Sequence, residues 1–345
     1  MKSTHLPRPS KAPLQRGATG GRRGIIPLLI SLAIIIPPCQ ATASEASLSN
    51  HAYITNQNDN SLSIIDLKTL RALKTLNIPG KPAGIAVNKT GTKAYVTSPA
   101  TKSLTIIDTK TQTITQTMPL QGGPLGIAVH PKGEPLYVAD WFNHQILVVS
   151  PSKGEITHKI PVGRAPAGLD LTPDGHLLIS ADRDSHQISL INTQTNRVTK
   201  TIKVGKRPFG ITIDPKGTRA YTANVKSNDV SIIDLAQQKV ISTVPVGNRP
   251  YASAIAQNRL FVSDQYSETV TVIDIKTLKT IKKIPVGEYP EGIAASQDER
   301  FIYVVCWFSN QLMRIDAGTL KITGITPTGE GPRAFGRFLA PTLGK

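Results

Sequence analysis

Residues 204–245 read VGKRPFGITIDPKGTRAYTANVKSNDVSIIDLAQQKVISTVP, and this stretch contains the unit that decides the fold. Short runs of Val, Ile, Thr and Tyr alternate with polar residues, which is the pattern of β-strands. Turn residues separate the runs, as in Asp214-Pro215-Lys216-Gly217, where Pro presets φ and Gly accepts a positive φ. The unit therefore predicts four short strands.

The same unit recurs along the chain. A proline, followed two residues later by glycine in most repeats and then by apolar residues, returns every 42 residues, with one interval of 40. A second column, mostly tyrosine, lies thirteen residues beyond most of the prolines, and a third column is mostly aspartate. The repeated prolines are Pro82, Pro124, Pro166, Pro208, Pro250, Pro290 and Pro332. Four strands in a repeat of roughly forty residues are typical of a β-propeller blade.

The length and the register predict a closed ring of seven blades. Residues 51–345 number 295, and seven units of 42 residues need 294. Tyr53-Ile54-Thr55 has the pattern of a second strand with no first strand before it, and residues 332–339 have that of a first strand with nothing after it. We therefore expect an all-β, seven-bladed propeller of four-stranded blades, whose first blade is completed by the C-terminal strand.

The tyrosine column carries a family resemblance. Tyr53-Ile54-Thr55-Asn56, Tyr95-Val96-Thr97-Ser98 and Tyr221-Thr222-Ala223-Asn224 resemble the YVTN repeats of bacterial and archaeal surface and periplasmic propellers, including the YncE-like proteins. The resemblance covers residues 51–340. It implies a propeller that binds or interacts at a surface, and it carries over no catalytic residue.

The N-terminal segment predicts export. Residues 1–43 contain six Lys or Arg and no Asp or Glu, and an apolar-rich run extends from Ile25 to Ile36. Small residues at Ala41 and Ala43 suit a signal peptidase, so we expect a signal peptide over 1–43 and a propeller over 44–345, in the bacterial periplasm or outside the cell. An uncleaved anchor is the alternative reading. Arg22-Arg23 leaves the choice between the general and the twin-arginine export routes open.

The net charge bears on the choice of partner, and the cysteine content bears on disulfide bonds. The formal net charge of +17 falls to +11 without residues 1–43, because six of the 40 basic residues are lost against 23 acidic ones. Basic residues such as Lys200 and Lys203 lie at solvent-facing strand positions, which favours protection of strand edges over nucleic-acid binding. Cys306 is then the one cysteine left, so no intrachain disulfide is expected. We expect a monomer with no membrane span after cleavage.

The candidate site lies where the repeats differ from one another. In a propeller, the loops before each first strand and after each second strand emerge on one face around the central channel. Convergent charged and aromatic residues in such a concavity are typical of a binding site, whereas a solvated rim is the alternative. The candidate ligand-binding residues are Arg164, Arg207, Arg249, Arg333, Tyr251, Glu291, Asp140, Trp141, Asp182, Arg183, His186, Asp264 and Trp307.

Catalytic signals are weak. His144, His186, Asp140 and Asp182 are metal ligands by type, but spacing by a whole repeat places them on separate loop tips. The sequence lacks the Gly-x-Ser-x-Gly, His-Glu-x-x-His and Cys-x-x-Cys-His motifs. We therefore expect no metal, cofactor or catalytic residue, and a non-catalytic module that binds a protein or an anionic ligand. The alternatives are a hydrolase or lactonase-like enzyme on the same face, and a nucleic-acid binder.

Overall fold

The computed structural model describes residues 50–341, which form 28 strands and one 3-10 turn, η1 (Arg183–Ser185). Blades 1 to 3 contain β1 (His51–Asn56), β2 (Ser61–Asp66), β3 (Arg71–Asn77); β4 (Gly84–Val87), β5 (Lys93–Ser98), β6 (Ser103–Asp108), β7 (Thr113–Pro119); β8 (Pro124–Val129), β9 (Leu136–Asp140), β10 (Gln145–Ser150) and β11 (Glu155–Pro161). Blades 4 and 5 contain β12 (Pro166–Leu171), β13 (Leu177–Asp182), β14 (Gln187–Asn192), β15 (Arg197–Lys203); β16 (Pro208–Ile213), β17 (Arg219–Asn224), β18 (Asp229–Asp234) and β19 (Lys239–Pro245). Blades 6 and 7 contain β20 (Pro250–Ala256), β21 (Arg259–Asp264), β22 (Thr269–Asp274), β23 (Thr280–Pro285); β24 (Pro290–Ala295), β25 (Phe301–Cys306), β26 (Gln311–Asp316) and β27 (Lys321–Pro327), and β28 (Phe335–Arg337) ends the series.

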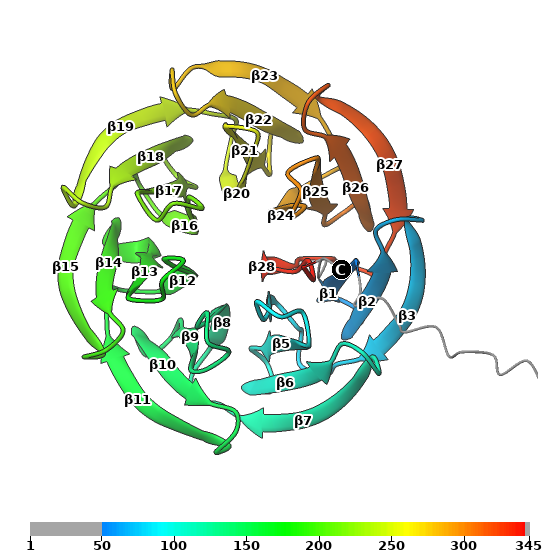
Figure 1. The fold of residues 1–345 in the computed structure, drawn as a ribbon, viewed down its shortest axis with the longest axis vertical. Helices are drawn as coiled ribbons and strands as arrows, with labels where there is room; N and C mark the ends of the chain where they lie inside the picture. Colours follow the sequence, from blue (N-terminus) through cyan, green and yellow to red (C-terminus); the bar gives the residue numbers. More distant parts are fainter. Residues whose placement is uncertain (1–49, 342–345) are drawn as a thin grey trace, which may run out of the picture. The chain divides into compact units, whose positions relative to one another are not determined.

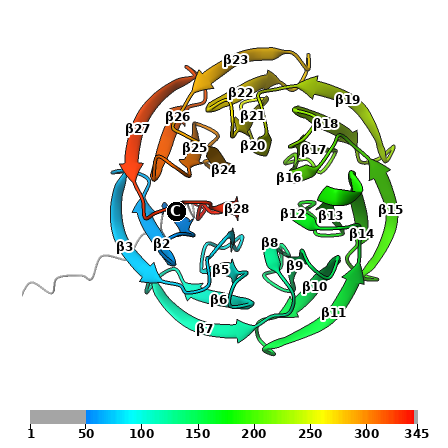
Figure 2. The same ribbon diagram turned by 180° about the vertical axis from the view of Figure 1, so that it is seen from behind.

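The blades surround a central axis, as the sequence repeat predicts (Figures 1 and 2). Within each blade, consecutive strands pair antiparallel, with the first strand at the centre and the fourth at the circumference. The prediction of a seven-bladed propeller is confirmed. The predicted signal peptide lies outside the described residues. Among residues 50–341, no helix has the length and apolar character needed to cross a bilayer.

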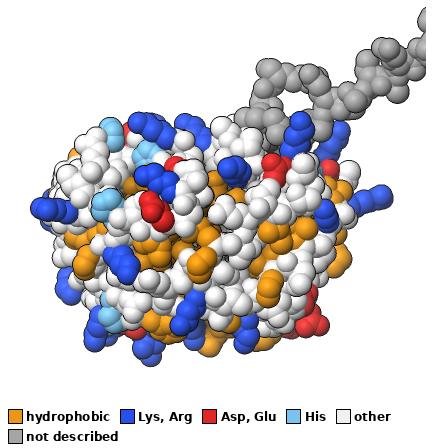
Figure 3. Space-filling model, turned by 90° about the horizontal axis from the view of Figure 1, so that it is seen from below, with side chains coloured by type: hydrophobic (Ala, Val, Ile, Leu, Met, Phe, Trp, Pro, Cys, Tyr) orange, Lys and Arg blue, Asp and Glu red, His pale blue; other side chains and the backbone are white. Residues whose placement is uncertain are grey.

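The core lies between the blades, because each sheet is apolar on both faces near the axis. One buried cluster joins Ala86, Tyr95 and Leu104 of blade 2 to Leu136 and Val138 of blade 3. The outer strands are exposed along most of their length and carry lysines such as Lys200 and Lys203. On the wall over β7 and β11, hydrophobic side chains lie mostly in the middle, and Lys and Arg lie mostly toward the two rims (Figure 3). Lys200 and Lys203 therefore lie at solvent-facing strand positions, as the sequence predicts.

The repeated glycine permits the innermost strands to approach one another. A Cβ atom at Gly84 would lie 2.0 Å from the backbone oxygen of Leu125 in the next blade. The same carbonyl accepts a hydrogen bond of 2.6 Å from the Thr97 hydroxyl, in the YVTN segment of blade 2. Thr55 makes the equivalent bond to the oxygen of Ala83. The glycine and threonine columns of the repeat therefore hold neighbouring blades together.

The C-terminal segment closes the ring with a pairing that the repeat alone does not predict. Residues Pro332 and Leu339 form antiparallel bridges to Asn56 and Ala52 of β1, so the segment supplies the innermost strand of blade 1. Between these bridges, β28 pairs in parallel with β4 of blade 2. The predicted closure is confirmed. The middle of the closing segment pairs with blade 2 and its two ends pair with blade 1, because the inner strands converge at the axis.

Candidate functional site

The two predicted sets of loops meet on one face of the ring. In each blade, the loop after the second strand is hydrogen-bonded to the loop before the first strand. For example, the Arg183 amide donates to the Ala165 oxygen at 3.1 Å, and the Trp307 amide donates to the Tyr289 oxygen at 3.0 Å. Because antiparallel strands place alternate loops at opposite ends, the remaining loops lie on the other face. We call the face formed by the loops before the first strands and after the second strands the channel-mouth face.

The residue after each repeated proline forms the floor of this face. Phe209 contacts Tyr251, with ring centroids 4.5 Å apart, and both contact Phe335 from the closing strand, at 5.0 and 5.4 Å. Trp141 packs against Phe209 from above, at 6.2 Å. The floor residues are Ala83, Leu125, Ala167, Phe209, Tyr251, Glu291 and Arg333. Aromatic packing therefore fills the mouth of the channel.

A buried polar network interrupts the apolar floor. Arg333 Nε lies 3.2 Å from Glu291 Oε2 and donates a hydrogen bond of 2.8 Å to the Tyr251 hydroxyl. Gln265 Nε2 donates to the other oxygen of Glu291 at 2.7 Å. Burial raises the pKa of the Glu291 carboxyl, and the Arg333 guanidinium offsets part of this effect. The guanidinium also lies near the Trp307 ring, with its carbon 5.8 Å from the centroid.

Aromatic side chains surround the floor at one repeat position that is absent from the candidate residues predicted from the sequence. Phe142, Tyr266 and Phe308 each lie two residues beyond the end of a second strand, and they are 68%, 57% and 62% exposed. They are the exposed aromatic side chains among residues 50–341. Their shared place in the repeat, next to Trp141 and Trp307, is the signal that could have found them.

The candidate arginines lie on this face, but in different environments. The Arg183 side chain is mostly buried and lies over Trp141, 5.3 Å from the ring centroid. Arg249 lies over Tyr266 at 4.4 Å and donates to its hydroxyl at 2.8 Å. Arg164 and Arg207 are exposed. Asp184 pairs with Arg183 at 2.8 Å and with Arg207 at 3.7 Å, so cationic groups outnumber carboxylates here.

The three candidate aspartates lie beneath the loops and face inward. Asp140, Asp182 and Asp264 are fully buried and accept hydrogen bonds from their own blades. Asp140 Oδ1 accepts from the Gly123 amide at 2.9 Å, and Asp182 Oδ2 accepts from Gly163 at 3.0 Å. Burial raises the pKa of Asp182, and it raises that of Asp264 to about 6. Their contacts hold the loops in place.

His186, the candidate histidine, also accepts a hydrogen bond from a loop amide. His186 adopts a positive φ, and its Nδ1 accepts a hydrogen bond of 3.1 Å from the Arg207 amide. His144 does the same for Ala165, and Asn228 occupies the equivalent place for Arg249. Within residues 50–341, no group of three or more His, Cys, Asp or Glu side chains is placed to hold a metal ion. Cys306 is buried, and burial raises the pKa of its thiol to about 12. A thiolate nucleophile is therefore disfavoured at neutral pH.

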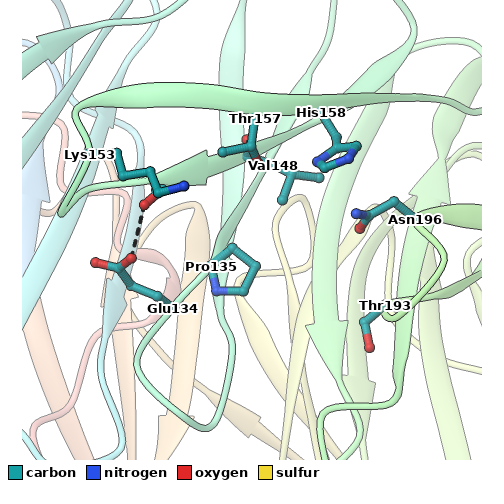
Figure 4. A pocket seen from close by; sticks show the side chains of 9 residues that line it. Glu134, Pro135, Val148, Lys153, Thr157, His158, Thr193 and Asn196 are labelled. Atoms are coloured by element: carbon teal, nitrogen blue, oxygen red, sulfur yellow. Dashed lines mark hydrogen bonds between the residues drawn. The ribbon is translucent and has the colours of Figure 1, made fainter.

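A cavity of about 410 Å³ opens on the opposite rim, between the loops of blades 3 and 4. Glu134, Pro135, His158 and Asn196 lie around it (Figure 4). The Glu134 carboxylate accepts hydrogen bonds from the Ser150 and Ser152 hydroxyls of its own blade, at 3.0 and 2.8 Å. This cavity contains none of the candidate residues.

Comparison with known families agrees with the repeat. The model of YNCE-like beta-propellers matches residues 39–130, and that of the seven-bladed lactonase propellers matches residues 102–204. The two matches support a YncE-like β-propeller family for the part of the chain that they cover. No curated protein matches this chain by sequence.

Solved structures share the propeller fold of this chain. Kuenenia stuttgartiensis hydrazine synthase is 20% identical over 75% of this chain and 90% of that chain, with a TM-score of 0.68. A functionally unknown protein from Desulfotomaculum acetoxidans is 18% identical over 83% and 99%, with a TM-score of 0.71. The dihydro-heme d1 dehydrogenase NirN in complex with DHE is 14% identical over 84% and 75%, with a TM-score of 0.63. At these identities the similarity concerns the fold alone.

Proposed function

We propose that this propeller is an exported, non-catalytic interaction module that binds a protein partner on its channel-mouth face. One observation carries the proposal: the exposed aromatic side chains of residues 50–341, Phe142, Tyr266 and Phe308, all lie on this face, which also contains the candidate arginines. Aromatic and arginine side chains are enriched where proteins bind each other, because they combine large apolar area with polar groups.

The spread of these residues favours a macromolecule over a small anion. Phe142 belongs to blade 3, Arg207 to the start of blade 5 and Phe308 to blade 7, so the surface extends over most of the ring. The floor between them is buried and supports the exposed residues from beneath. A partner that covers several blades can bury the area that a stable interface needs, about 800 Å² per protein.

The test is capture of the partner from the native envelope with matched variants. Arg207→Ala combined with Arg249→Ala should abolish capture and change the melting temperature little. Lys132→Ala with Lys216→Ala, on exposed loops of the opposite face, should leave capture unchanged. Loss of capture with the Lys132 and Lys216 pair, but not with the Arg207 and Arg249 pair, would contradict the proposal, because the interface would then lie on the opposite face.

A hydrolase on the same face is the second candidate, because the lactonase model matches residues 102–204. The carboxylates and histidines of this region that could act on a substrate are largely engaged in loop hydrogen bonds. Hydrolysis of a sugar lactone by the purified protein, lost on Asp184→Asn, would replace the interaction proposal. An unchanged background rate is the result we expect.

A further inference from the structure

Charged side chains separate into two sectors around the channel-mouth face. The basic sector covers the loops from blade 4 to the start of blade 6, and the acidic sector covers those from blade 6 to blade 1. The basic sector contains Arg164, Arg183, Lys206, Arg207, Lys226 and Arg249, with Asp184 and the partly exposed Asp229 among them. The acidic sector contains Asp59, Glu268, Glu288 and Glu330, with Lys81 at its edge, where its amide donates to Asn60. All of these acidic-sector side chains are exposed.

The two sectors leave much of their charge unpaired. In the described part of the chain, the ion pairs of this face join Asp184 to Arg183 and Arg207, and Glu291 to Arg333. No carboxylate of the acidic sector takes part in them. The Asp59 carboxylate accepts hydrogen bonds from the Ser61 hydroxyl and the Glu330 amide. The other exposed charges of each sector are available to a molecule that covers the face, where desolvation strengthens a charged hydrogen bond.

The acidic sector also contains a row of aromatic rings. Tyr289 lies between Tyr266 and Phe308, with ring centroids 5.5 and 5.1 Å apart. Arg249 lies over Tyr266 at the boundary between the sectors, 4.4 Å from the ring centroid. Carboxylates beside aromatic rings are suited to Lys or Arg side chains, because the cation can contact both an anion and a ring face.

We propose that the partner presents a charge-polarised polypeptide segment to this face, and this inference rests on the proposed function. Its Asp or Glu side chains lie over the basic sector, and its Lys or Arg side chains lie over the acidic sector and the aromatic row. A uniformly anionic chain, such as a nucleic acid or an acidic glycan, gains in the basic sector but meets Glu268 and Glu288 in the other. Like charges across an interface disfavour the wrong partner. The face therefore selects a polypeptide and fixes its direction.

Three labelled synthetic peptides of equal length with a central Trp test this inference by fluorescence anisotropy. One has Glu in one half and Lys in the other, one is all Glu, and one is all Lys. We expect the bipolar peptide to bind at least tenfold more tightly than either uniform peptide, with an affinity that falls as salt is added. An all-Glu peptide that binds as well as the bipolar one would overturn the inference.

Charge reversal supplies the matched variants. Glu268→Lys with Glu288→Lys should move the preference to the all-Glu peptide, and Lys206→Glu with Arg207→Glu should move it to the all-Lys peptide. Lys132→Glu with Lys216→Glu, on the opposite face, should preserve the original order.

Two outcomes separate this inference from the proposed function. Capture of the native partner that depends on Arg207 and Arg249, without any preference for the bipolar peptide, would overturn the charge polarity and leave the interaction role intact. A dimer seen by light scattering and dissociated by the Glu268→Lys and Glu288→Lys pair would overturn both, because the face would then bind a second copy of the chain.

Discussion

Arg333 and Glu291 form an ion pair at the floor of the channel mouth, with Nε and Oε2 3.2 Å apart. They occupy the same repeat position in successive innermost strands, where the other five blades place Ala, Leu, Phe or Tyr. Arg333 belongs to the closing segment, so the pair links the C-terminal end of the chain to blade 7. Ring closure and the candidate site therefore share a residue.

This pair should show strong energetic coupling. Arg333→Met leaves the Glu291 carboxyl buried without its cation, and we expect a loss of about 3–5 kcal/mol in the free energy of unfolding. Adding Glu291→Leu should recover much of that loss, because two apolar side chains can replace a buried ion pair. Denaturant unfolding of the single and double variants measures the coupling. Additive losses would contradict it.

The repeated glycine should be essential at the close contact between blades. Gly84→Ala places a Cβ atom 2.0 Å from the Leu125 oxygen, so we expect a loss of at least ~2 kcal/mol in stability. Gly318→Ala is the matched control, because its nearest neighbour would lie 3.4 Å away and its φ is not positive. Equal melting temperatures for the two variants would contradict the account of blade contact.

Deprotonation of the Asp264 carboxyl should lower the free energy of unfolding as the pH rises. Its folded-state pKa of about 6 exceeds the ordinary value of 3.8, so between these values the folded state keeps a proton that the unfolded state loses. The free energy of unfolding therefore falls through this window, by up to ~3 kcal/mol from this group. Asp264→Asn should be more stable than the wild type at pH 7.5, and the difference should disappear near pH 4. Asn already occupies the equivalent position at Asn56 and Asn224.

Measurement of unfolding across pH checks this prediction. A variant that is less stable than the wild type at pH 7.5 would show instead that the Thr269 and Thr271 hydroxyls need a carboxylate as their acceptor.

Removal of the closing segment should open the ring. Deletion of residues 333–345 removes the bridge from Leu339 to Ala52 and the parallel pairing of β28 with β4. Exposed strand edges promote aggregation, so we expect loss of cooperative unfolding or association into large species. An unchanged thermal midpoint and a monomeric elution volume would contradict the closure.

The sequence predicts the fold because each blade repeats the same strand and turn signals. The Pro-x-Gly column, the Tyr column and the incomplete repeats at Tyr53 and Pro332 together specify blade number and closure. The parallel pairing of Phe335 with Gly84 is not predictable from the repeat, because it depends on convergence of inner strands in space.

The candidate site is predictable only in part. Divergence between repeats identifies the face and its arginines. The same criterion also selects Asp140, Asp182 and Asp264, because their residue type differs from blade to blade, although each binds its own loops. Burial and hydrogen bonding distinguish such residues from exposed ones such as Phe308, and neither property can be read from a column of residue types.

Site-specific photocrosslinking in the native cell tests the central claim most directly. A benzophenone amino acid replaces Phe308 on the channel-mouth face or, in the matched variant, Lys216 on the opposite face. Our account predicts a discrete protein adduct from position 308 that is lost when Arg207→Ala and Arg249→Ala are added, and no such adduct from position 216. An adduct from position 216 with none from position 308 would contradict it.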